Sequence, residues 1–270
     1  MGALVIDSTV LEPNHPQVVR VDMALRRWPY RLDGFTIALL SDFHYDRHFS
    51  VHPLNAAIGM VNALRPDLIA LTGDFVSMNM LSKSDAAAAA LAEPCAQLLG
   101  QLKAPHGLWA VLGNHDCFSD PVRVAGALHA QGIPVLENRS IPIERDGARF
   151  WLTGVGDVLA GTARLETALQ PVPNSEATIL LAHEPDYADY VAGHTQAVDL
   201  QLSGHSHGGQ VRLPFLRPLY LPELARKYIA GQYRVGPLTL YTNRGLGTIG
   251  VPVRLNCPPE ITLLTMRKSA

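Results

Sequence analysis

The sequence predicts an α/β protein, and three observations support this class. Short apolar runs bounded by turn residues recur along the 270 residues, as is typical of strands buried on both faces. Segments with apolar residues at helical spacing lie between the early runs, and such alternation indicates an α/β architecture. With 47% hydrophobic and 17% charged residues, the composition is sufficient for an ordinary buried core.

The first half of the chain alternates predicted strands with predicted helices. The strands are expected at residues 35–41, 67–73 and 107–113. The helical patterns cover residues 51–67, 82–105 and 121–135. The first helix stops at Arg65-Pro66, because the residue before a proline avoids the helical region. Pro94 must break or kink the second helix, and Gly132 ends the third.

The second half has more closely spaced strands, more glycine and fewer helical patterns. Its strands are expected at residues 149–155, 178–183, 198–204, 238–243 and 260–266. No internal repeat or linker divides the chain, so we interpret residues 1–270 as one domain, completed by C-terminal strands and loops at 212–270.

The composition argues against several classes of protein. A net charge of −2 favours neither a nucleic-acid groove nor an anionic membrane surface. The three cysteines lack CxxC spacing, which supports neither a disulfide framework nor a cysteine zinc site, and Cys117 is interpreted as a packing residue. No stretch has the length of a membrane span, and "MGALVIDSTV" lacks the basic region of a secretory signal. A cytoplasmic location is expected, although a chain trimmed of an N-terminal anchor would look the same.

Polar side chains follow five of the predicted strands, at the point where each strand ends. They are Asp42, His44, Asp74, Asn114, His115, Asp116, His183, His205 and His207. Because the carboxyl ends of parallel strands emerge at one edge of a sheet, we expect these side chains to gather there. Taken singly, each also fits ordinary turn chemistry, since Asp and Asn favour strand ends and glycine-rich turns.

Such a gathering of carboxylates and imidazoles requires a counter-charge. Neighbouring like charges make ionisation costly, and a bound divalent cation reverses that penalty. Oxygen and imidazole donors without thiolate suit Mn²⁺, Zn²⁺ or Fe²⁺ better than Ca²⁺ or a soft metal. The donors are too many for one tetrahedral ion. They suffice for two ions roughly 3.5–4 Å apart that share a carboxylate, an arrangement used for displacement at phosphorus.

The motifs "DFH", "GD", "GNHD", "AHEPD" and "GHSH" occur in this order within residues 35–211. They resemble the metal-binding blocks of the calcineurin-like metallophosphoesterases. The tail, with "GGQVRLP", "RGLGT" and "VPVRLNCPPEITLL", is similar to the subgroup that contains YkuE-type phosphodiesterases and a UDP-2,3-diacylglucosamine pyrophosphatase. The resemblance implies a single metallophosphoesterase domain with a four-layer αββα sandwich of two mixed β-sheets flanked by helices.

Position by position, the resemblance also implies a role for each motif residue. The first ion would be held by Asp42, His44 and His207. The second ion would be held by Asn114, His183 and His205. Asp74 would bridge the two ions, and a bridging hydroxide would be the nucleophile. His115 would stabilise or protonate the leaving oxygen, and Asp116 would orient the His115 ring.

Substrate contacts are predicted at three further residues. Tyr45 and Arg47 directly follow the first ligands, and their alternative is an ordinary solvated loop. Arg244, in "TNRGLGT", could bind a phosphate group or form a structural salt bridge. The apolar, proline-broken segment 214–231 could form a lip for a hydrophobic substrate, touch a membrane, or pack under its own loop.

These inferences predict an enzyme that hydrolyses a phosphodiester or phosphomonoester bond in a small molecule. A phosphoprotein substrate is not favoured, because no arginine cluster is present. The nearest alternative is a nucleotide-sugar or lipid pyrophosphatase of the UDP-2,3-diacylglucosamine type. A non-catalytic scaffold is the more distant alternative, since such relatives tend to lose ligands that this chain retains. The oligomeric state is not predicted.

Overall fold

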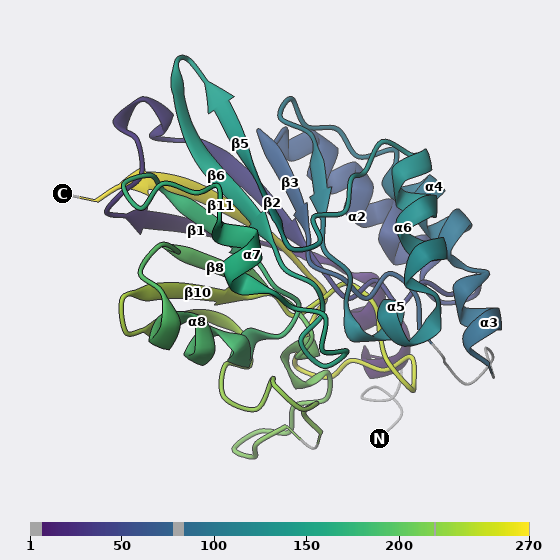
Figure 1. The fold of residues 1–270 in the computed structure, drawn as a ribbon. Helices are drawn as coiled ribbons and strands as arrows, with labels where there is room; N and C mark the ends of the chain where they lie inside the picture. The colour runs from purple at the N-terminus through teal and green to yellow at the C-terminus, as the bar shows by residue number, and fades with distance from the viewer. Residues whose placement is uncertain (1–6, 78–83, 219, 270) are drawn as a thin grey trace.

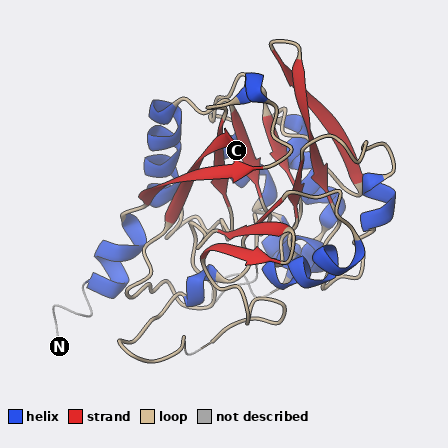
Figure 2. Ribbon diagram, turned by 90° about the vertical axis from the view of Figure 1, so that its left-hand side faces the viewer, coloured by secondary structure: helices blue, strands red, loops and turns tan. Residues whose placement is uncertain are grey.

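Two mixed β-sheets stack face to face in the computed structural model, which describes residues 7–77, 84–218 and 220–269. Helices lie on both outer sides of the strands, as Figure 2 shows. Two predictions fall partly outside the described residues. The absence of a secretory signal was predicted from a segment that includes residues 1–6, and the second predicted helix includes residues 82–83. This is the predicted four-layer αββα sandwich.

The first sheet has five strands in the order β1-β11-β2-β3-β4 (Figure 1). Their bounds are β1 Gln17–Leu25, β2 Thr36–Leu40, β3 Leu68–Leu71, β4 Leu108–Ala110 and β11 Glu260–Lys268. Strands β2, β3 and β4 are mutually parallel, whereas β11 runs antiparallel to β2 and parallel to β1. The last strand of the chain therefore lies between the first two.

The second sheet has six strands in the order β5-β6-β7-β8-β10-β9. Their bounds are β5 Arg139–Arg145, β6 Ala148–Gly154, β7 Thr178–Leu181, β8 Leu200–Ser203, β9 Gly231–Val235 and β10 Leu238–Thr242. The four central strands, β6, β7, β8 and β10, are parallel, and the two edge strands are antiparallel to their neighbours.

Seven α-helices and five short helical turns complete the described chain. The α-helices are α2 Val51–Leu64, α3 Asp85–Ala89, α4 Ala92–Leu99, α5 Asn114–Ser119, α6 Pro121–Ala130, α7 Leu165–Leu169 and α8 Ala188–His194. The turns are η1 Asp7–Leu11, η2 Glu12–Asn14, η3 Tyr30–Leu32, η4 Pro185–Tyr187 and η5 His207–Gly209. The second predicted helix is indeed broken, into α3 and α4. The break precedes Pro94, because proline is tolerated in the first turn of α4, where its missing N–H is not needed.

The continuous apolar runs are explained by burial on both strand faces. In β2, Ile37 and Leu39 belong to the core between the two sheets, whereas Ala38 and Leu40 belong to the core beneath α2, α4 and α6. A third core packs α7 and α8 against the outer face of the second sheet. Because side chains alternate along a strand, a strand between two apolar layers needs apolar residues at every position.

Candidate metal centre

The polar side chains that end the strands come from both sheets and meet at one edge. Asp42 and His44 follow β2, Asp74 follows β3, and Asn114 opens α5 directly after β4. The histidines of the second sheet are His183, which follows β7, and His205 and His207, which follow β8. The sequence argument rested on the edge of one sheet. The structure instead brings the carboxyl ends of parallel strands in two sheets together.

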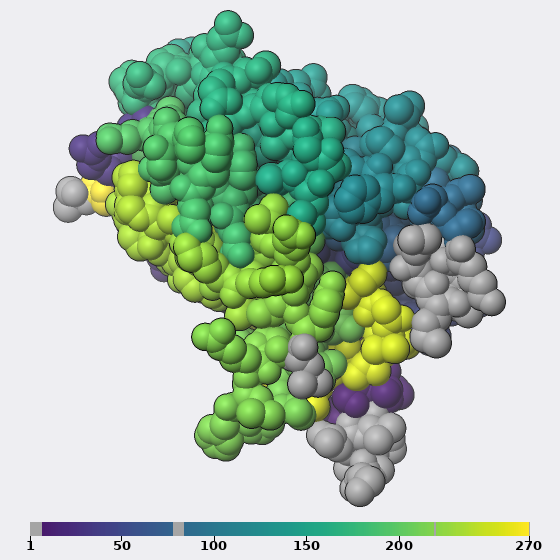
Figure 3. Space-filling view, turned by 60° about the horizontal axis from the view of Figure 1, so that its bottom comes forward, coloured from purple at the N-terminus to yellow at the C-terminus, as the bar shows by residue number. Residues whose placement is uncertain are grey.

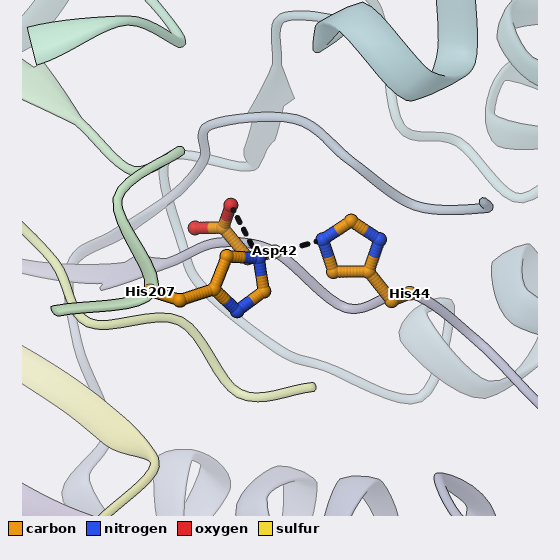
Figure 4. A group of neighbouring side chains, drawn as sticks. All are labelled: Asp42, His44 and His207. Atoms are coloured by element: carbon orange, nitrogen blue, oxygen red, sulfur yellow. Dashed lines mark hydrogen bonds and ion pairs between the residues drawn. The ribbon is translucent and has the colours of Figure 1, made fainter. Parts of the chain in front are cut away.

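The first group of neighbouring side chains consists of Asp42, His44 and His207 (Figure 4). The Nε2 atoms of His44 and His207 are 2.8 Å apart, and His207 Nε2 lies 3.5 Å from Asp42 Oδ1. All three residues are buried. Two imidazole nitrogens and a carboxylate oxygen thus point at one small volume.

The second group consists of Asp74, His183 and His205. His183 Nε2 lies 3.1 Å from Asp74 Oδ2 and 3.1 Å from His205 Nδ1. Asp74 Oδ2 is also 3.5 Å from His44 Nε2, which belongs to the first group. Asp74 therefore lies between the two groups. The remaining predicted ligand, Asn114, is buried, and its Oδ1 atom has no hydrogen-bond partner.

Hydrogen bonds determine which ring nitrogen faces each group. His183 Nδ1 donates to the carbonyl of Thr72 at 2.6 Å, and His205 Nε2 donates to the carbonyl of Glu223 at 2.8 Å. When the rings are neutral, the other nitrogen of each ring presents its lone pair to the second group. A carbonyl that fixes the ring in this way is the usual partner of a metal-binding histidine.

Burial shifts the pKa values of the clustered groups. It lowers the pKa of His44 to about 3 and that of His205 to about 4, so both rings are neutral at pH 7. It raises the pKa of Asp42 to about 7. Burial would also raise the pKa of Asp74, but the neighbouring His183 outweighs it and holds this pKa well below the usual value. Neutral imidazoles and an ionised carboxylate are the forms that bind a cation.

The backbone at these positions adopts a conformation that side chains usually avoid. Five of the seven predicted ligands have positive φ: Asp42 (53°), His44 (39°), Asp74 (57°), His205 (66°) and His207 (51°). Residues other than glycine rarely adopt this region, and each instance costs on the order of 1 kcal/mol or more. The sharp turns aim the side chains inward at the strand ends.

Two motif glycines allow the backbones to approach the clustered carboxylates. A Cβ atom on Gly204 would lie 1.8 Å from Ser41 Oγ and 2.4 Å from Asp42 Oδ2. A Cβ atom on Gly113 would lie 2.3 Å from Asp74 Oδ1. Because only glycine fits at either position, the glycines of "GHSH" and "GNHD" are required by packing.

The residues present therefore fit a pair of divalent ions. The donors are imidazole nitrogens, carboxylate oxygens and one amide oxygen, and the Oδ1 atom of Asn114 has no hydrogen-bond partner. A buried polar atom without a partner is costly in an ordinary core. Oxygen and imidazole donors suit Mn²⁺, Zn²⁺ or Fe²⁺.

His115 lies beside both groups, but Asp116 differs from its predicted role. The His115 ring meets the His44 ring edge-on at 5.1 Å between centroids, and His115, His44 and Asp74 form a third group of side chains close enough to hold an ion. The Asp116 carboxylate accepts hydrogen bonds from the backbone N–H groups of Asp74, Phe75, Val76 and Gly113. Among the described contacts none joins Asp116 to the His115 ring, because both Asp116 oxygens are already occupied. Asp116 thus anchors the segment that carries Asp74.

The three predicted substrate contacts do not line the space beside the metal groups. Tyr45 is buried in the core under α2, and Arg47 is exposed on the following loop. Arg244 donates to Glu260 at 2.5 Å and lines a separate cavity with His15. Arg244 thus forms a structural salt bridge, which was the predicted alternative to phosphate binding.

A cavity of about 530 Å³ opens next to both groups. Asp74, Asn114, His115, His205 and His207 contribute to its lining. The apolar part of the lining consists of Leu159, Val211, Tyr220, Pro222, Ile249 and Val251. Two loops and the segment after β8 thus supply an apolar wall to the same cavity that the candidate ligands line.

Two supporting residues were missed by the sequence argument. Arg254 is fully buried and donates to the carbonyls of Arg244, Gly245, Gly247 and Cys257. Gly247 N in turn donates to the carbonyl of Asp42 at 2.7 Å, so this loop supports a candidate ligand. Glu184 accepts from the backbone N–H groups of Val158 and Leu159. A single arginine in "VPVRLN" carries no sequence signal of this role. The position of Glu184 beside His183 could have suggested one.

Known proteins with similar sequences are metallophosphoesterases. The calcineurin-like phosphoesterase family matches residues 35–209. The metallophosphoesterase YkuE of Bacillus subtilis is 33% identical over 96% of this chain and 88% of that protein. The phosphodiesterase YaeI of Escherichia coli is 35% identical over 86% of this chain and 82% of that protein. A transmembrane protein with a metallophosphoesterase domain from Danio rerio is 32% identical over 94% of this chain and 58% of that protein.

Solved structures share the fold. The NAD nucleotidase of Haemophilus influenzae matches 78% of this chain with a TM-score of 0.51 and 18% sequence identity. The sulfate thiohydrolase SoxB of Thermus thermophilus matches 78% with a TM-score of 0.52 and 13% identity. The chain spans about half the length of these two structures (50% and 52%), and the likeness concerns the fold alone.

Within the described residues, no helix is both long enough and apolar enough to span a membrane. The family match, the related phosphodiesterase and the two Asp/His groups lead to one conclusion. The chain belongs to the calcineurin-like phosphoesterase family and is a dinuclear, metal-dependent phosphoric ester hydrolase.

Proposed function

We propose that this enzyme hydrolyses phosphodiester bonds in small molecules and that the seven predicted ligands hold its two ions. Asp42, His44 and His207 would hold the first ion. Asn114, His183 and His205 would hold the second. The position of Asp74 Oδ2, 3.5 Å from His44 Nε2 and 3.1 Å from His183 Nε2, supports its role as the shared ligand. This arrangement is the main support for the proposal.

The ions are proposed to be Mn²⁺, Zn²⁺ or Fe²⁺, because the donor set contains no thiolate. When bound, such ions lower the pKa of water and neutralise phosphoryl oxygens. The remaining chemistry belongs to the chain. His115 lines the cavity beside both groups and would donate a proton to the leaving oxygen. Asp116 would act indirectly, by anchoring the Asp74 backbone through the bond from Asp74 N at 2.9 Å.

The proposal treats residues 1–270 as one metallophosphoesterase domain. Its support is β11, which pairs with β1 and β2 and so joins the C-terminal segment to the first sheet. A cytoplasmic location is also part of the proposal. The three cysteines are unpaired, as is usual in a reducing compartment.

A second candidate is a nucleotide-sugar or lipid pyrophosphatase of the UDP-2,3-diacylglucosamine type. Phe215 and Leu216 in the apolar segment are exposed, and Tyr220 lines the cavity, as a hydrophobic substrate would require. The apolar cavity wall offers no cation for a second phosphate among its described residues, which favours the phosphodiester.

The test is metal content and turnover after reconstitution with Mn²⁺. A panel of phosphomonoesters, cyclic nucleotides, linear diesters and UDP-sugars ranks the substrate classes. We expect bis(p-nitrophenyl) phosphate to be hydrolysed and UDP-sugars to be poor substrates. Preferred cleavage of UDP-sugars would establish the second candidate instead.

His115→Ala is expected to retain both ions and to lower kcat by roughly 10²–10⁴-fold, the usual contribution of a general acid. His52→Ala, which changes an exposed histidine at the start of α2, serves as the matched control and should match wild type. Bound metal without turnover, with both variants indistinguishable from wild type, would establish the scaffold alternative.

A further inference from the structure

We propose that the substrate carries an uncharged apolar group next to its phosphoester, and that the apolar wall of the cavity binds this group. The inference rests on the proposed function and narrows its substrate class. The apolar wall consists of Leu159, Val211, Tyr220, Pro222, Ile249 and Val251. It lines the same cavity as the candidate ligands, so a phosphoester held at the ligands has this apolar surface within the cavity to receive its substituent.

Hydrogen bonds join the wall to a candidate ligand and to the chain neighbour of another. Glu184, which follows His183, accepts hydrogen bonds from Val158 N at 3.3 Å and Leu159 N at 3.2 Å. His205 donates to the carbonyl of Glu223, the neighbour of Pro222, at 2.8 Å. The wall is therefore pre-formed relative to the ligands, which favours binding because little ordering remains to be done.

Gln210 fixes the loop that contributes Ile249 and Val251 to the wall. Its Oε1 atom accepts from Ile249 N at 2.9 Å, and its Nε2 atom donates to the carbonyls of Ile249 and Val251 at 3.1 and 3.2 Å. Gln210 itself has φ of 51°. A constrained residue that clamps the 249–251 loop through three hydrogen bonds indicates a built surface.

The charge of the cavity indicates that the bound group is uncharged. Among the described residues that line it, no lysine or arginine occurs, and Glu223 is the one carboxylate beyond the candidate ligands. A second phosphate or a carboxylate on the substrate would lose its hydration here without gaining a cationic partner. Binding an alkyl or aryl group would instead remove apolar surface from water.

Part of the apolar wall is exposed to solvent. Tyr220 is 71% exposed and Val251 is 49% exposed, and both line the cavity. Leu216 (63% exposed) and Phe215 (fully exposed) precede Tyr220 in the chain, in the light-green segment that projects from the body of the molecule in Figure 3. An apolar group longer than the cavity would therefore meet exposed apolar side chains of its lining, Tyr220 and Val251, where it reaches solvent.

The first experiment compares p-nitrophenyl alkyl phosphodiesters with methyl, butyl and octyl groups on the Mn²⁺ enzyme. We expect kcat/KM to rise by about two- to fourfold per methylene buried against the wall. Ile249→Ser and Val251→Ser should flatten this dependence, because they lower kcat/KM for the octyl ester by a larger factor than for the methyl ester. Val122→Ser is the matched control, because Val122 is 82% exposed on α6 and does not line this cavity.

The second experiment measures binding without catalysis. Tributyl phosphate, an uncharged ester, is titrated calorimetrically into the Mn²⁺-loaded protein. Binding is expected to weaken several-fold in Val251→Ser and to stay unchanged in Val122→Ser. Equal binding to all three proteins would contradict the assignment of the wall.

A third comparison identifies the source of the apolar group. The octyl ester is presented as a monomer in solution and within phosphatidylcholine vesicles. Faster turnover in vesicles supports the proposal with a lipid as the source, and faster turnover of the monomer supports it with a free amphiphile as the source. Turnover that is measurable but independent of chain length would overturn the inference alone. Absence of turnover for every ester would overturn the proposed function and the inference with it.

Discussion

At the scale of single residues, the candidate metal centre lowers the free energy of unfolding of the protein when no ion is bound. Asp42, Asp74 and His205 combine buried ionisable side chains with a left-handed backbone. Each of these features opposes folding when no cation is present. The cost is localised at the strand ends, where the glycines Gly113 and Gly204 already allow the chain segments to approach closely.

Asp74→Asn tests the shared ligand. The amide has nearly the same shape but no charge, so both ions should bind more weakly. We expect the protein to retain less than about one ion per chain after dialysis, with a matching loss of turnover, as measured by elemental analysis. Asp189→Asn is the control, because Asp189 forms an ion pair with Lys227 on the surface. An Asp74→Asn protein that keeps its full metal content would refute the bridging role.

At the scale of elements, edge strands explain most of what sequence analysis missed. The eight strands it predicted are all present, whereas β1, β5 and β9 were not predicted. These three lie at the edges of the two sheets. An edge strand is partly exposed, so its sequence carries polar residues and lacks the continuous apolar run that identifies an interior strand.

The strand β5 could have been predicted from the turn that follows it. β5 and β6 are joined by Asp146-Gly147, and both residues have positive φ, of 55° and 72°. Asp-Gly between two strands is the usual sequence of a tight hairpin turn. The gathering of the candidate ligands could be predicted, because each of their motifs is contiguous in the sequence and directly follows a predicted strand. The apolar wall was not predictable as a unit, because its three segments are brought together only by the tertiary fold.

Asp116 in α5 links this helix to the segment that follows β3. Asp116 accepts four backbone hydrogen bonds from two segments, and Asp116→Asn would place an amide donor against some of these donors. We expect a loss of roughly 1–3 kcal/mol of unfolding free energy, measured by denaturant titration, together with weaker metal binding. Asp120→Asn, at the N-cap of α6, is the matched control, because asparagine caps a helix as well as aspartate does. Equal stability of the two variants would contradict the anchoring role.

At the scale of the whole molecule, each candidate ion site draws on both sheets. The first combines Asp42 and His44 with His207, and the second combines Asp74 with His183 and His205. Ions bound there would cross-link the two halves of the sandwich. Metal binding should therefore stabilise the entire fold and not merely a loop.

Adding Mn²⁺ at about 100 times its dissociation constant should stabilise the protein by roughly 2.7 kcal/mol per independent site, and chelation should reverse the effect. For a chain of this size, that corresponds to a rise in Tm of about 5 °C or more, measured by scanning calorimetry. Asp74→Asn should show a smaller rise, and His52→Ala should behave as wild type. A Tm that does not respond to Mn²⁺ in wild type would contradict a site that spans the two sheets.

The position of β11 has a consequence for how the protein is made. This strand, residues 260–268, lies between β1 and β2, so a growing polypeptide cannot finish its first sheet until residues 260–268 have been synthesised. All the candidate ligands, which lie within residues 42–207, are therefore synthesised before the sheet that carries Asp42 is complete. We expect ions to be held firmly only after β11 has joined this sheet.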